Sequence, residues 1–371
     1  MSLVGGAATP ASPHRILIVR LSAIGDNVMT TPLIPCLRKS YPHAQIYWLC
    51  EARSAPLLQA HPELQEVIIW PKADWLALWR GRRWLATLAA VWRFRQRLAS
   101  YHFDLVLDAQ GLLKSGVLTW FTGAPKRVGL GSKEGSAWLM TRVVPRRDDH
   151  PLIGGEYHDL ALAIGLSVEP FALQLHVPAQ ANHKARVTIE RFGLGEGFVA
   201  LVPFTTRPQK HWLAARWPLL CREIWHQFHL PCAILGGPND SVMAGQIEAA
   251  LETGIAVINL TGSMALSLID AAALIRRARA VVGVDTGMTH MGSALQRPTV
   301  ALFGSTVPYT EPLARRTRVL FEPMACAPCN KHPTCKGAYT CMRQLRVDQV
   351  TDALREALAT ADEERRESTA H

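Results

Sequence analysis

The feature that most constrains the fold is residues 281–304, which read VVGVDTGMTHMGSALQRPTVALFG. The apolar runs at 280–284 and 299–303 have the length and β-branched content of buried strands, and the residues between them suit a tight turn followed by a helix. Two strands connected in this way belong to an open parallel sheet. Such a sheet presents its ligand crevice at the carboxyl ends of its strands, which is where Asp285, Thr286 and Gly287 lie.

The turn after the first of these strands has two interpretations. Thr286 is a candidate N-cap, and the helix start behind it offers unpaired N–H groups that bind phosphate. Asp285 would be anionic beside that phosphate, so its carboxylate suits sugar hydroxyls better, and His290 faces the same mouth one helical turn later. The alternative is an ordinary turn that caps a helix.

Composition excludes several classes of protein. The chain has 371 residues, 49% hydrophobic and 19% charged, which fits two globular α/β domains. No apolar run is as long as a membrane span, and the N-terminus lacks a signal-peptide core, so we expect a cytoplasmic protein. The net charge of +10 suggests nucleic acid, a phosphate-rich substrate or an anionic membrane surface as the partner. Because no nucleic-acid-binding motif accompanies the charge, we expect no nucleic acid.

The first half opens with a buried strand, Ile16 to Val19, a loop over residues 20–26, and a helix predicted from Asn27 to Ser40. A strand, a loop with Gly25 and a helix resemble the start of a Rossmann unit, but GxGxxG is absent, which weakens a dinucleotide interpretation. Asp26 is either a capping charge at the helix N-terminus or a general base.

Tryptophans and arginines are interspersed, at irregular spacing, over residues 72–97. One interpretation is an amphipathic helix pair with a solvated basic face. The other is a surface for anionic lipid, with tryptophan at the interface and arginine on the phosphates. Further along, Lys114 follows a predicted strand at 103–107, and Lys133 follows a short one at 126–130.

The second half repeats the alternation of strands and helices. A strand at 198–203 leads into FTTRPQKHW, which places Thr205, Thr206 and Lys210 at the mouth of a second sheet. Two hydroxyls and one ammonium on a single loop suit a diphosphate.

These patterns predict an α/β protein with two Rossmann-like domains that face each other across a cleft. The predicted boundaries are a tail at 1–15, an N-terminal domain at 16–177, a linker at 178–182, a C-terminal domain at 183–346, and a terminal helix with a tail at 347–371.

Four cysteines follow the last predicted strand with the spacing C-x2-C-x5-C-x5-C, at Cys326, Cys329, Cys335 and Cys341. Four thiols in sixteen residues can hold zinc, but a closed zinc site normally uses two well-separated pairs. Reduced surface thiols or redox pairing are the alternatives, and we expect no metal here.

Four segments, in this order, resemble the bacterial lipopolysaccharide heptosyltransferases of glycosyltransferase family 9, which have the GT-B fold. They are SAIGD at 22–26, DAQGLLKS at 108–115, TTRPQKHW at 205–212 and VDTGMTH at 284–290. The resemblance runs from about Ile16 to Arg346. The second and third segments look most like heptosyltransferase I, whereas the cysteine cluster is more like heptosyltransferases of the later inner core.

The resemblance implies an inverting transfer from ADP-heptose, without a cofactor or metal, to a Kdo or heptose residue of the lipid A inner core. The family's general base matches Asp26, and its heptose-binding acid matches Asp285, with His290 in the same loop. The diphosphate contacts match Thr205, Thr206, Lys210, Thr286 and Gly287. Leu266 falls where the family lines the adenine pocket, and Asn239 or Asp240 falls near its ribose-binding acid. The candidates for acceptor contacts are Arg80, Arg82, Arg83, Lys114 and Lys133.

Such an enzyme would act as a peripheral protein on the inner face of the inner membrane of a Gram-negative-type cell. Two other functions remain open at this point. A nucleotide-sugar epimerase could use the same scaffold, although it would need no acceptor surface. A non-catalytic protein that binds nucleotides or lipopolysaccharide precursors would not need Asp26 together with Lys210 and Asp285.

Overall fold

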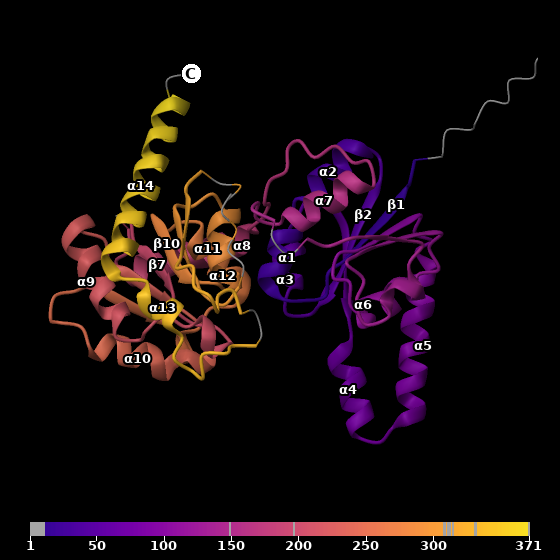
Figure 1. The fold of residues 1–371 in the computed structure, drawn as a ribbon, viewed down its shortest axis with the longest axis horizontal. Coiled ribbons are helices and arrows are strands. Elements are labelled where there is room, and N and C mark those ends of the chain that lie inside the picture. Colours follow the sequence, from indigo (N-terminus) through magenta and orange to yellow (C-terminus); the bar gives the residue numbers. More distant parts are fainter. Residues whose placement is uncertain are drawn as a thin grey trace, which may run out of the picture.

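The computed structural model describes residues 12–147, 150–195, 197–306, 309, 313, 315–329 and 332–369. It contains two six-stranded parallel sheets, each with helices on its faces, that form separate domains side by side (Figure 1). The expected architecture of two Rossmann-like α/β domains is therefore confirmed.

The N-terminal sheet has the strand order β3-β2-β1-β4-β5-β6. Its strands are β1 (Arg15–Val19), β2 (Gln45–Glu51), β3 (Leu64–Trp70), β4 (Leu105–Asp108), β5 (Lys126–Leu130) and β6 (Arg142–Val144). The central strand β1 is apolar on both faces because helices cover both sides of the sheet, and Ile16 pairs with Ile46 and Leu105.

The C-terminal sheet has the corresponding order β12-β11-β10-β7-β8-β9. Its strands are β7 (Val199–Val202), β8 (Cys232–Leu235), β9 (Val257–Leu260), β10 (Ala280–Val284), β11 (Thr299–Phe303) and β12 (Thr317–Phe321). The two apolar runs predicted around Asp285 are β10 and β11, and they pair in parallel with Val281 opposite Thr299.

Helices and short 3-10 turns (η) connect the strands. Those of the N-terminal domain are α1 (Ile24–Thr30), α2 (Leu33–Ser40), α3 (Ala55–Leu58), α4 (Lys72–Arg80), α5 (Trp84–Ser100), α6 (Leu113–Phe121), η1 (Ser136–Leu139) and α7 (Gly155–Ala163). Those that follow are α8 (Ala179–Arg191), η2 (Pro208–Lys210), α9 (Arg216–Phe228), η3 (Pro238–Asp240), α10 (Ser241–Ala249), η4 (Gly262–Met264), α11 (Leu268–Ile275), α12 (Gly287–Ala294), α13 (Thr340–Gln344) and α14 (Val347–Thr369). None of the helices within the described residues is long and apolar enough to cross a membrane.

The structure differs from the predicted elements in several places. The single helix predicted from Asn27 to Ser40 is in fact two helices, α1 and α2, separated at Thr31 and Pro32. The first of them starts at Ile24, three residues earlier than predicted. Pro178 is the N-cap of α8, so most of the predicted linker is the first turn of that helix. The short edge strands β6 and β12 were not predicted, because a brief apolar run beside polar residues gives little period-two signal.

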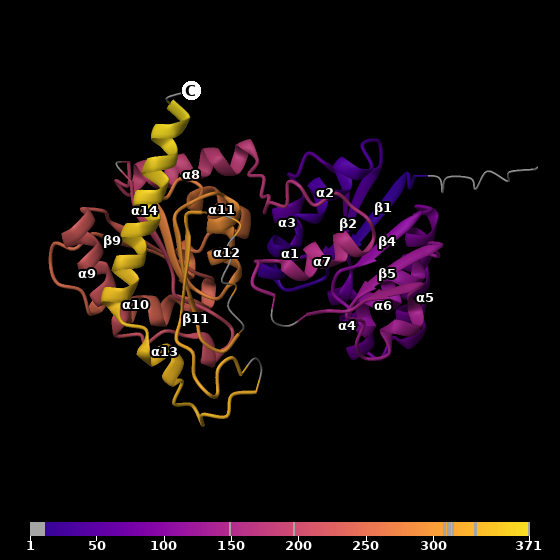
Figure 2. The same ribbon diagram turned by 45° about the horizontal axis from the view of Figure 1, so that its top comes forward.

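The ends of the chain also depart from the predicted boundaries. Residues 1–11 of the predicted tail lie outside the described residues, whereas Arg15 already belongs to β1. The terminal helix α14 packs against the C-terminal sheet (Figure 2), because its apolar positions recur every three or four residues. Val350, Leu354 and Ala361 are accordingly buried.

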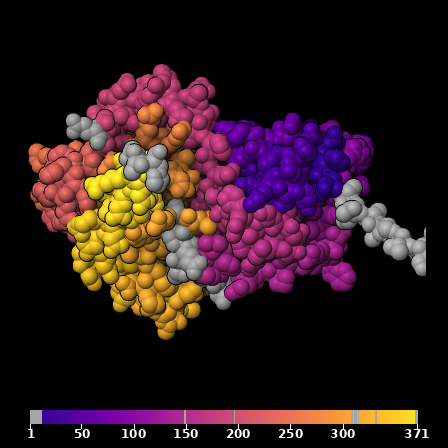
Figure 3. Space-filling model, turned by 90° about the horizontal axis from the view of Figure 1, so that it is seen from above, coloured from indigo at the N-terminus to yellow at the C-terminus, as the bar shows by residue number. Residues whose placement is uncertain are grey.

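The two domains meet where α1 and α12 touch. A Cβ atom added at Gly25 would lie 2.9 Å from Cδ2 of His290 and 3.4 Å from Cα of Gly287, and one added at Gly287 would lie 2.7 Å from Cγ2 of Ile24. Only glycine at these positions allows the two helices to approach so closely. The space-filling view in Figure 3 shows the domains as two lobes in contact.

Gly25→Ala should disturb this contact. Alanine normally stabilises a helix relative to glycine by about 0.5–1 kcal/mol, but a methyl group forced into a filled site costs about 1–3 kcal/mol. We expect a net loss in the free energy of unfolding, or a more open pair of domains by small-angle X-ray scattering. Gly245→Ala in α10, where the added Cβ meets nothing within 4 Å, is the matched control and should be neutral or stabilising. Equal effects of the two substitutions would contradict the close contact.

Candidate functional site

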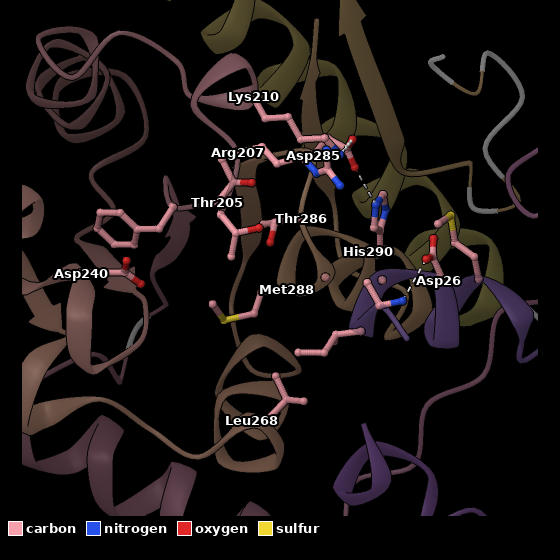
Figure 4. Close-up of a pocket in the computed structure, with 17 residues that line it drawn as sticks. Asp26, Thr205, Arg207, Lys210, Asp240, Leu268, Asp285, Thr286, Met288 and His290 are labelled. Carbon is pink, nitrogen blue, oxygen red and sulfur yellow. Dashed lines mark hydrogen bonds and ion pairs between the residues drawn. The ribbon is translucent and has the colours of Figure 1, made fainter. Parts of the chain in front are cut away.

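A cleft of about 380 Å³ lies between the carboxyl ends of the two sheets. Its volume is in the range of roughly 300–1,000 Å³ that is typical of small-molecule sites. The N-terminal domain contributes the start of α1, and the C-terminal domain contributes the loop after β7, η3, and the starts of α11 and α12. The lining residues are Ala23, Ile24, Gly25, Asp26, Met29, Phe204, Thr205, Thr206, Arg207, Lys210, Asp240, Leu268, Asp285, Thr286, Gly287, Met288 and His290. Figure 4 shows that the labelled side chains run from Asp240 at one end to Asp26 at the other.

Asp26 lies in the first turn of α1, where one of its carboxylate oxygens has polar partners and the other has none among the described residues. Its Oδ2 accepts a hydrogen bond from the N–H of Ala23 at 2.9 Å and lies 2.6 Å from a guanidinium nitrogen of Arg20. Its Oδ1 has no hydrogen-bond partner among the described residues. Burial alone would raise the pKa of Asp26, but the Arg20 charge and the Ala23 N–H together hold it below its usual value. Asp26 is therefore ionised at neutral pH and has one oxygen able to accept a proton or a hydroxyl hydrogen bond.

Arg20 is a site residue that sequence reasoning missed. It is buried, donates to the carbonyl of Ala109 at 3.0 Å, and lies over the ring of Tyr157. A buried arginine nearly always has an acidic partner, so its place directly after a buried strand and six residues before Asp26 was the available signal.

The DAQG motif after β4 supports the loop that carries Arg20 and Asp26. Asp108 is fully buried and accepts hydrogen bonds from the N–H groups of Gln110 and Gly111 and from the hydroxyl of Ser115. The side chain of Gln110 in turn accepts from the N–H of Leu21 at 2.8 Å. The motif thus holds the β1 loop in place, and Asp108 itself does not line the cleft.

Asp285 is the centre of a buried charge network on the opposite side of the cleft. Its Oδ2 pairs with the ammonium of Lys210 and accepts from the hydroxyl of Thr306, and its Oδ1 lies 3.1 Å from Nε2 of His290. Because a carboxylate can only accept, Nε2 of His290 is the donor, and its Nδ1 lies 3.4 Å from the hydroxyl of Tyr309. Burial would raise the pKa of Asp285, but His290 and Lys210 lower it far below the ordinary range. Thr306 and Tyr309 were not identified from the sequence.

The loop after β7 places hydroxyl and cationic groups beside the N-terminus of α12. Thr205, Thr206 and Lys210 line the cleft as expected, together with Arg207, which was not predicted. Thr286 is the N-cap of α12 by backbone geometry, but its side chain makes no capping hydrogen bond. The first N–H groups of α12 thus remain available, beside two cations, to an anionic ligand.

The end of the cleft opposite Asp26 is more apolar and carries a single acid. Leu268, Met288 and Phe204 line it together with Asp240, whose Oδ2 accepts from the N–H of Gly237 at 2.7 Å. Of the two candidates suggested by the sequence, Asp240 faces the cleft and Asn239 does not.

The placement of Leu266 requires a correction. It does not line the cleft but a separate cavity, which it shares with Lys184 and Asp270. Leu268 at the start of α11 lines the cleft instead, because Ser267 caps α11 and turns the chain between the two leucines.

The five candidates for acceptor contacts do not line the cleft. Lys114 lies on the first turn of α6, 4.0 Å from Glu51, and Lys133 lies in the loop after β5. Both follow strands at the same edge of the sheet as Asp26. In contrast, Arg80, Arg82 and Arg83 are at the junction of α4 and α5, which extends in Figure 1 beyond the rest of the domain and away from α1 and α12.

The four clustered cysteines are free thiols with different environments. Cys326 is exposed and Cys341 is buried. Burial, together with the neighbouring cysteines, raises the pKa of Cys341. Within the described part of the chain, the one group of three potential metal ligands within reach of one another is His150, His158 and Asp159, not the cysteines.

Comparison with known proteins identifies similar sequences and folds. The family profile for glycosyltransferase family 9 (heptosyltransferase) matches residues 91–340. Lipopolysaccharide heptosyltransferase 1 of Pseudomonas aeruginosa is 32% identical over 333 residues, which cover 85% of this chain and 86% of that protein. The structure of E. coli ADP-heptose lipopolysaccharide heptosyltransferase II is 25% identical, with a TM-score of 0.72, covering 94% of this chain and 99% of that one. E. coli heptosyltransferase WaaC with ADP-2-deoxy-2-fluoro heptose is 24% identical, with a TM-score of 0.69, covering 92% and 99%.

Asp285→Asn should reveal the strength of the Lys210–Asp285–His290 network. Because Lys210 would lose its anionic partner in a buried site, we expect the free energy of unfolding at neutral pH to fall by about 1–3 kcal/mol. The folded-state pKa of Asp285 lies below the unfolded value of about 3.9, so its stabilisation is complete above that pH and is lost as the pH falls through the folded pKa. Denaturant titrations should thus show a difference between parent and variant that shrinks below about pH 4.

The matched control is Asp352→Asn, which removes an exposed carboxylate from a surface ion pair with Arg355. It should change the free energy of unfolding by no more than about 0.5 kcal/mol. A pH-independent effect of Asp285→Asn would mean that the carboxylate charge does not hold the network together.

Proposed function

Since the chain belongs to glycosyltransferase family 9, the heptosyltransferases, and is a glycosyltransferase of lipopolysaccharide inner-core synthesis, we propose that it transfers heptose from ADP-heptose with inversion and that Asp26 is the general base. The observation that carries the proposal is the distribution of groups across the cleft. An ionised carboxylate with an open oxygen comes from the N-terminal domain, and a cationic, N–H-rich surface comes from the C-terminal domain. An inverting displacement needs its base and its leaving group on opposite faces of the sugar.

The C-terminal side of the cleft suits an ADP-sugar. Lys210, Arg207 and the N-terminus of α12 can bind the diphosphate, and the hydroxyls of Thr205, Thr206 and Thr286 can donate to its oxygens. At the apolar end, Asp240 can accept from a ribose hydroxyl, with Leu268 and Met288 beside the base. A bound ADP-2-deoxy-2-fluoro heptose in the structurally similar WaaC is in keeping with this donor.

Asp285 then has two roles. One is to neutralise Lys210 and orient His290 through the contacts seen in the structure. When a diphosphate binds, the three N–H donors of Lys210 can be shared between phosphate and Asp285, which frees lone pairs on the carboxylate for heptose hydroxyls. We propose that His290 remains hydrogen-bonded to Asp285 and closes the sugar site beside Gly287.

The chemical step follows from these positions. Oδ1 of Asp26 takes the proton from the acceptor hydroxyl as that oxygen bonds to the anomeric carbon, and the bond from that carbon to ADP breaks. Negative charge grows on the leaving diphosphate, where Lys210, Arg207 and the N–H groups of α12 are already oriented to stabilise it. Arg20 keeps Asp26 ionised and fixes its Oδ2, so that Oδ1 is the reactive oxygen.

The acceptor is proposed to be the Kdo or heptose residue of the lipid A inner core, reached from the N-terminal side. Lys114 and Lys133 are suitable contacts for its anionic groups, because they follow strands at the same edge of the sheet as Asp26. The similarity to a heptosyltransferase 1 over most of the chain favours the first heptose addition. The reaction would take place at the cytoplasmic face of the inner membrane, where we expect the chain to bind as a peripheral protein.

Asp26→Asn should separate catalysis from donor binding. The amide is nearly the same size but cannot take a proton, so we expect kcat to fall by a factor of about 10²–10⁴. The dissociation constant for ADP, measured by calorimetry, should stay close to that of the parent. Asp240→Asn at the other end of the cleft is the contrasting variant, with a raised KM for the donor and an unchanged kcat. Parent-like turnover in Asp26→Asn would remove Asp26 from the role of base.

Lys210→Ala should weaken donor binding. A hydrogen bond to a charged group contributes about 1.5–3 kcal/mol, so we expect the dissociation constant for ADP to rise about tenfold to a hundredfold. Lys184→Ala removes another lysine that is paired with an aspartate, Asp270, at 3.0 Å outside the cleft, and it should leave the constant unchanged. If both variants bind ADP equally well, the diphosphate does not lie beside Lys210.

A further inference from the structure

The exposed tryptophans of the molecule are confined to one part of the N-terminal domain. The chain has eleven tryptophans, and the five with strongly exposed side chains all lie between residues 79 and 138. They are Trp79, Trp84, Trp92, Trp120 and Trp138. Tryptophan exposed on a water-facing surface is unfavourable, so such a concentration marks an interaction surface.

Three of these tryptophans are on the α4–α5 hairpin, residues 72–100, which extends beyond the rest of its domain in Figure 1. The hairpin is anchored at its base, where Trp75 packs edge-on against Phe94 and Trp70. Toward its tip the side chains turn outward, and α4 has no fully buried residue. Trp79 and Trp84 pack edge-on against each other across the tip, with ring centroids 4.2 Å apart, and both remain exposed.

An apolar stripe continues from the tip along the outer face of α5. Leu85, Leu88 and Trp92 are spaced at three and four residues, so they share one face of the helix. Leu85 is 84% exposed and Leu88 is 66% exposed. The opposite face carries Thr87, Phe94 and Leu98, which are buried against the domain. The helix thus has two apolar faces, and only one of them has a partner in the described structure.

The charges that surround this stripe are almost all positive. The hairpin contains seven basic residues and one acidic residue, Asp74. Lys72 and Arg97, near its base, pair with Glu51 and Glu66. Arg80, Arg82, Arg83 and Arg93 make no ion pair with any acidic side chain that the structure describes. Arg95 lies over the ring of Trp120 on α6, which extends the same surface toward the domain.

We infer that the α4–α5 hairpin docks on an anionic lipid bilayer. Its exposed leucines and tryptophans, Leu85, Leu88, Trp79, Trp84 and Trp92, would lie in the headgroup region, and Arg80, Arg82, Arg83 and Arg93 would contact lipid phosphates. The combination of apolar side chains, tryptophan and arginine is that of an interfacial helix, and each cation near an anionic surface adds to binding. A second copy of the chain is a poorer occupant, because pairing two such hairpins would bring their arginines together.

This inference deepens the proposed function, on which its biological purpose rests, since a lipid-anchored acceptor is presented at a membrane. It also reassigns Arg80, Arg82 and Arg83 from the sugar acceptor to the lipid surface. The hairpin and the acceptor side of the cleft both belong to the N-terminal domain, so docking would hold that side of the cleft near the membrane while the C-terminal domain remains free to bind donor.

Vesicle flotation tests the inference without reference to catalysis. The full chain is mixed with vesicles of phosphatidylcholine alone or of phosphatidylcholine with phosphatidylglycerol. We expect binding only to the anionic vesicles, and weaker binding at high salt. The double variant Leu85→Ser, Leu88→Ser should lower the affinity at least about tenfold through lost apolar burial, and Arg82→Gln, Arg83→Gln by about tenfold through lost charge.

Two controls match these changes on the C-terminal domain. Val242→Ser removes an apolar side chain that is 74% exposed on α10, and Arg276→Gln with Arg277→Gln removes two exposed charges after α11; both should bind vesicles as the parent does. Vesicle binding that none of the hairpin changes affects would overturn the inference. So would a fall in molecular mass by light scattering in the leucine variant, because the hairpin would then bind a second copy.

A transfer assay separates this inference from the proposed function. The leucine variant should keep parent-like turnover on a lipid-free Kdo oligosaccharide and lose turnover on the same sugar carried by lipid A in vesicles. A parent that binds vesicles through the hairpin but transfers no heptose would refute the proposed function and leave the docking surface in place.

Discussion

The site depends on the contact between α1 and α12 at Gly25 and Gly287. Each helix begins at the carboxyl end of a central strand, and each presents a glycine to the other domain. This contact brings Asp26 close to His290, so that a carboxylate from one domain and a helix start with unpaired N–H groups from the other face a single cleft. A side chain at either glycine would separate the two groups, and neither domain alone contains both. The proposed catalytic site therefore depends on the domain interface.

The carboxylates of Asp26 and Asp285 are each paired within their own domain. Arg20 pairs with Asp26 on one side, and Lys210 and His290 surround Asp285 on the other. This arrangement stabilises buried charges that would otherwise be costly, and it leaves Oδ1 of Asp26 and the first N–H groups of α12 as the open positions. In the proposed reaction the positive surface is already present before the donor binds. The donor then draws hydrogen bonds of Lys210 from Asp285 to its phosphate. Donor binding and the order of the sugar site are then coupled through one carboxylate.

Much of the fold and part of the site could be predicted from the sequence, for identifiable reasons. Short apolar runs that end in polar residues located β1, β10 and β11, and with them Asp26 and Asp285, because strand ends in a parallel sheet share one edge. Residues whose role depends on which way the side chain faces, or on a tertiary partner, could not be assigned from the sequence. Leu268 rather than Leu266 faces the cleft because of a helix cap between them, and Arg20 is tied to Asp26 by tertiary packing. The sequence also did not show that Arg80, Arg82 and Arg83 lie on a projecting hairpin and not at the cleft. Charge and spacing do not indicate how far a pair of helices extends from its domain.

The most direct test of the account is ADP release from ADP-heptose, measured with and without a Kdo-terminated lipid A acceptor. A glycosyltransferase that uses Asp26 as base should release ADP only when an acceptor hydroxyl is present, and the similarity to a heptosyltransferase 1 predicts release with this acceptor. Release only with an already heptosylated acceptor would keep the reaction and move it to a later step. ADP release that does not depend on acceptor, or no release with either acceptor, would contradict the assignment of the cleft as the site of heptose transfer.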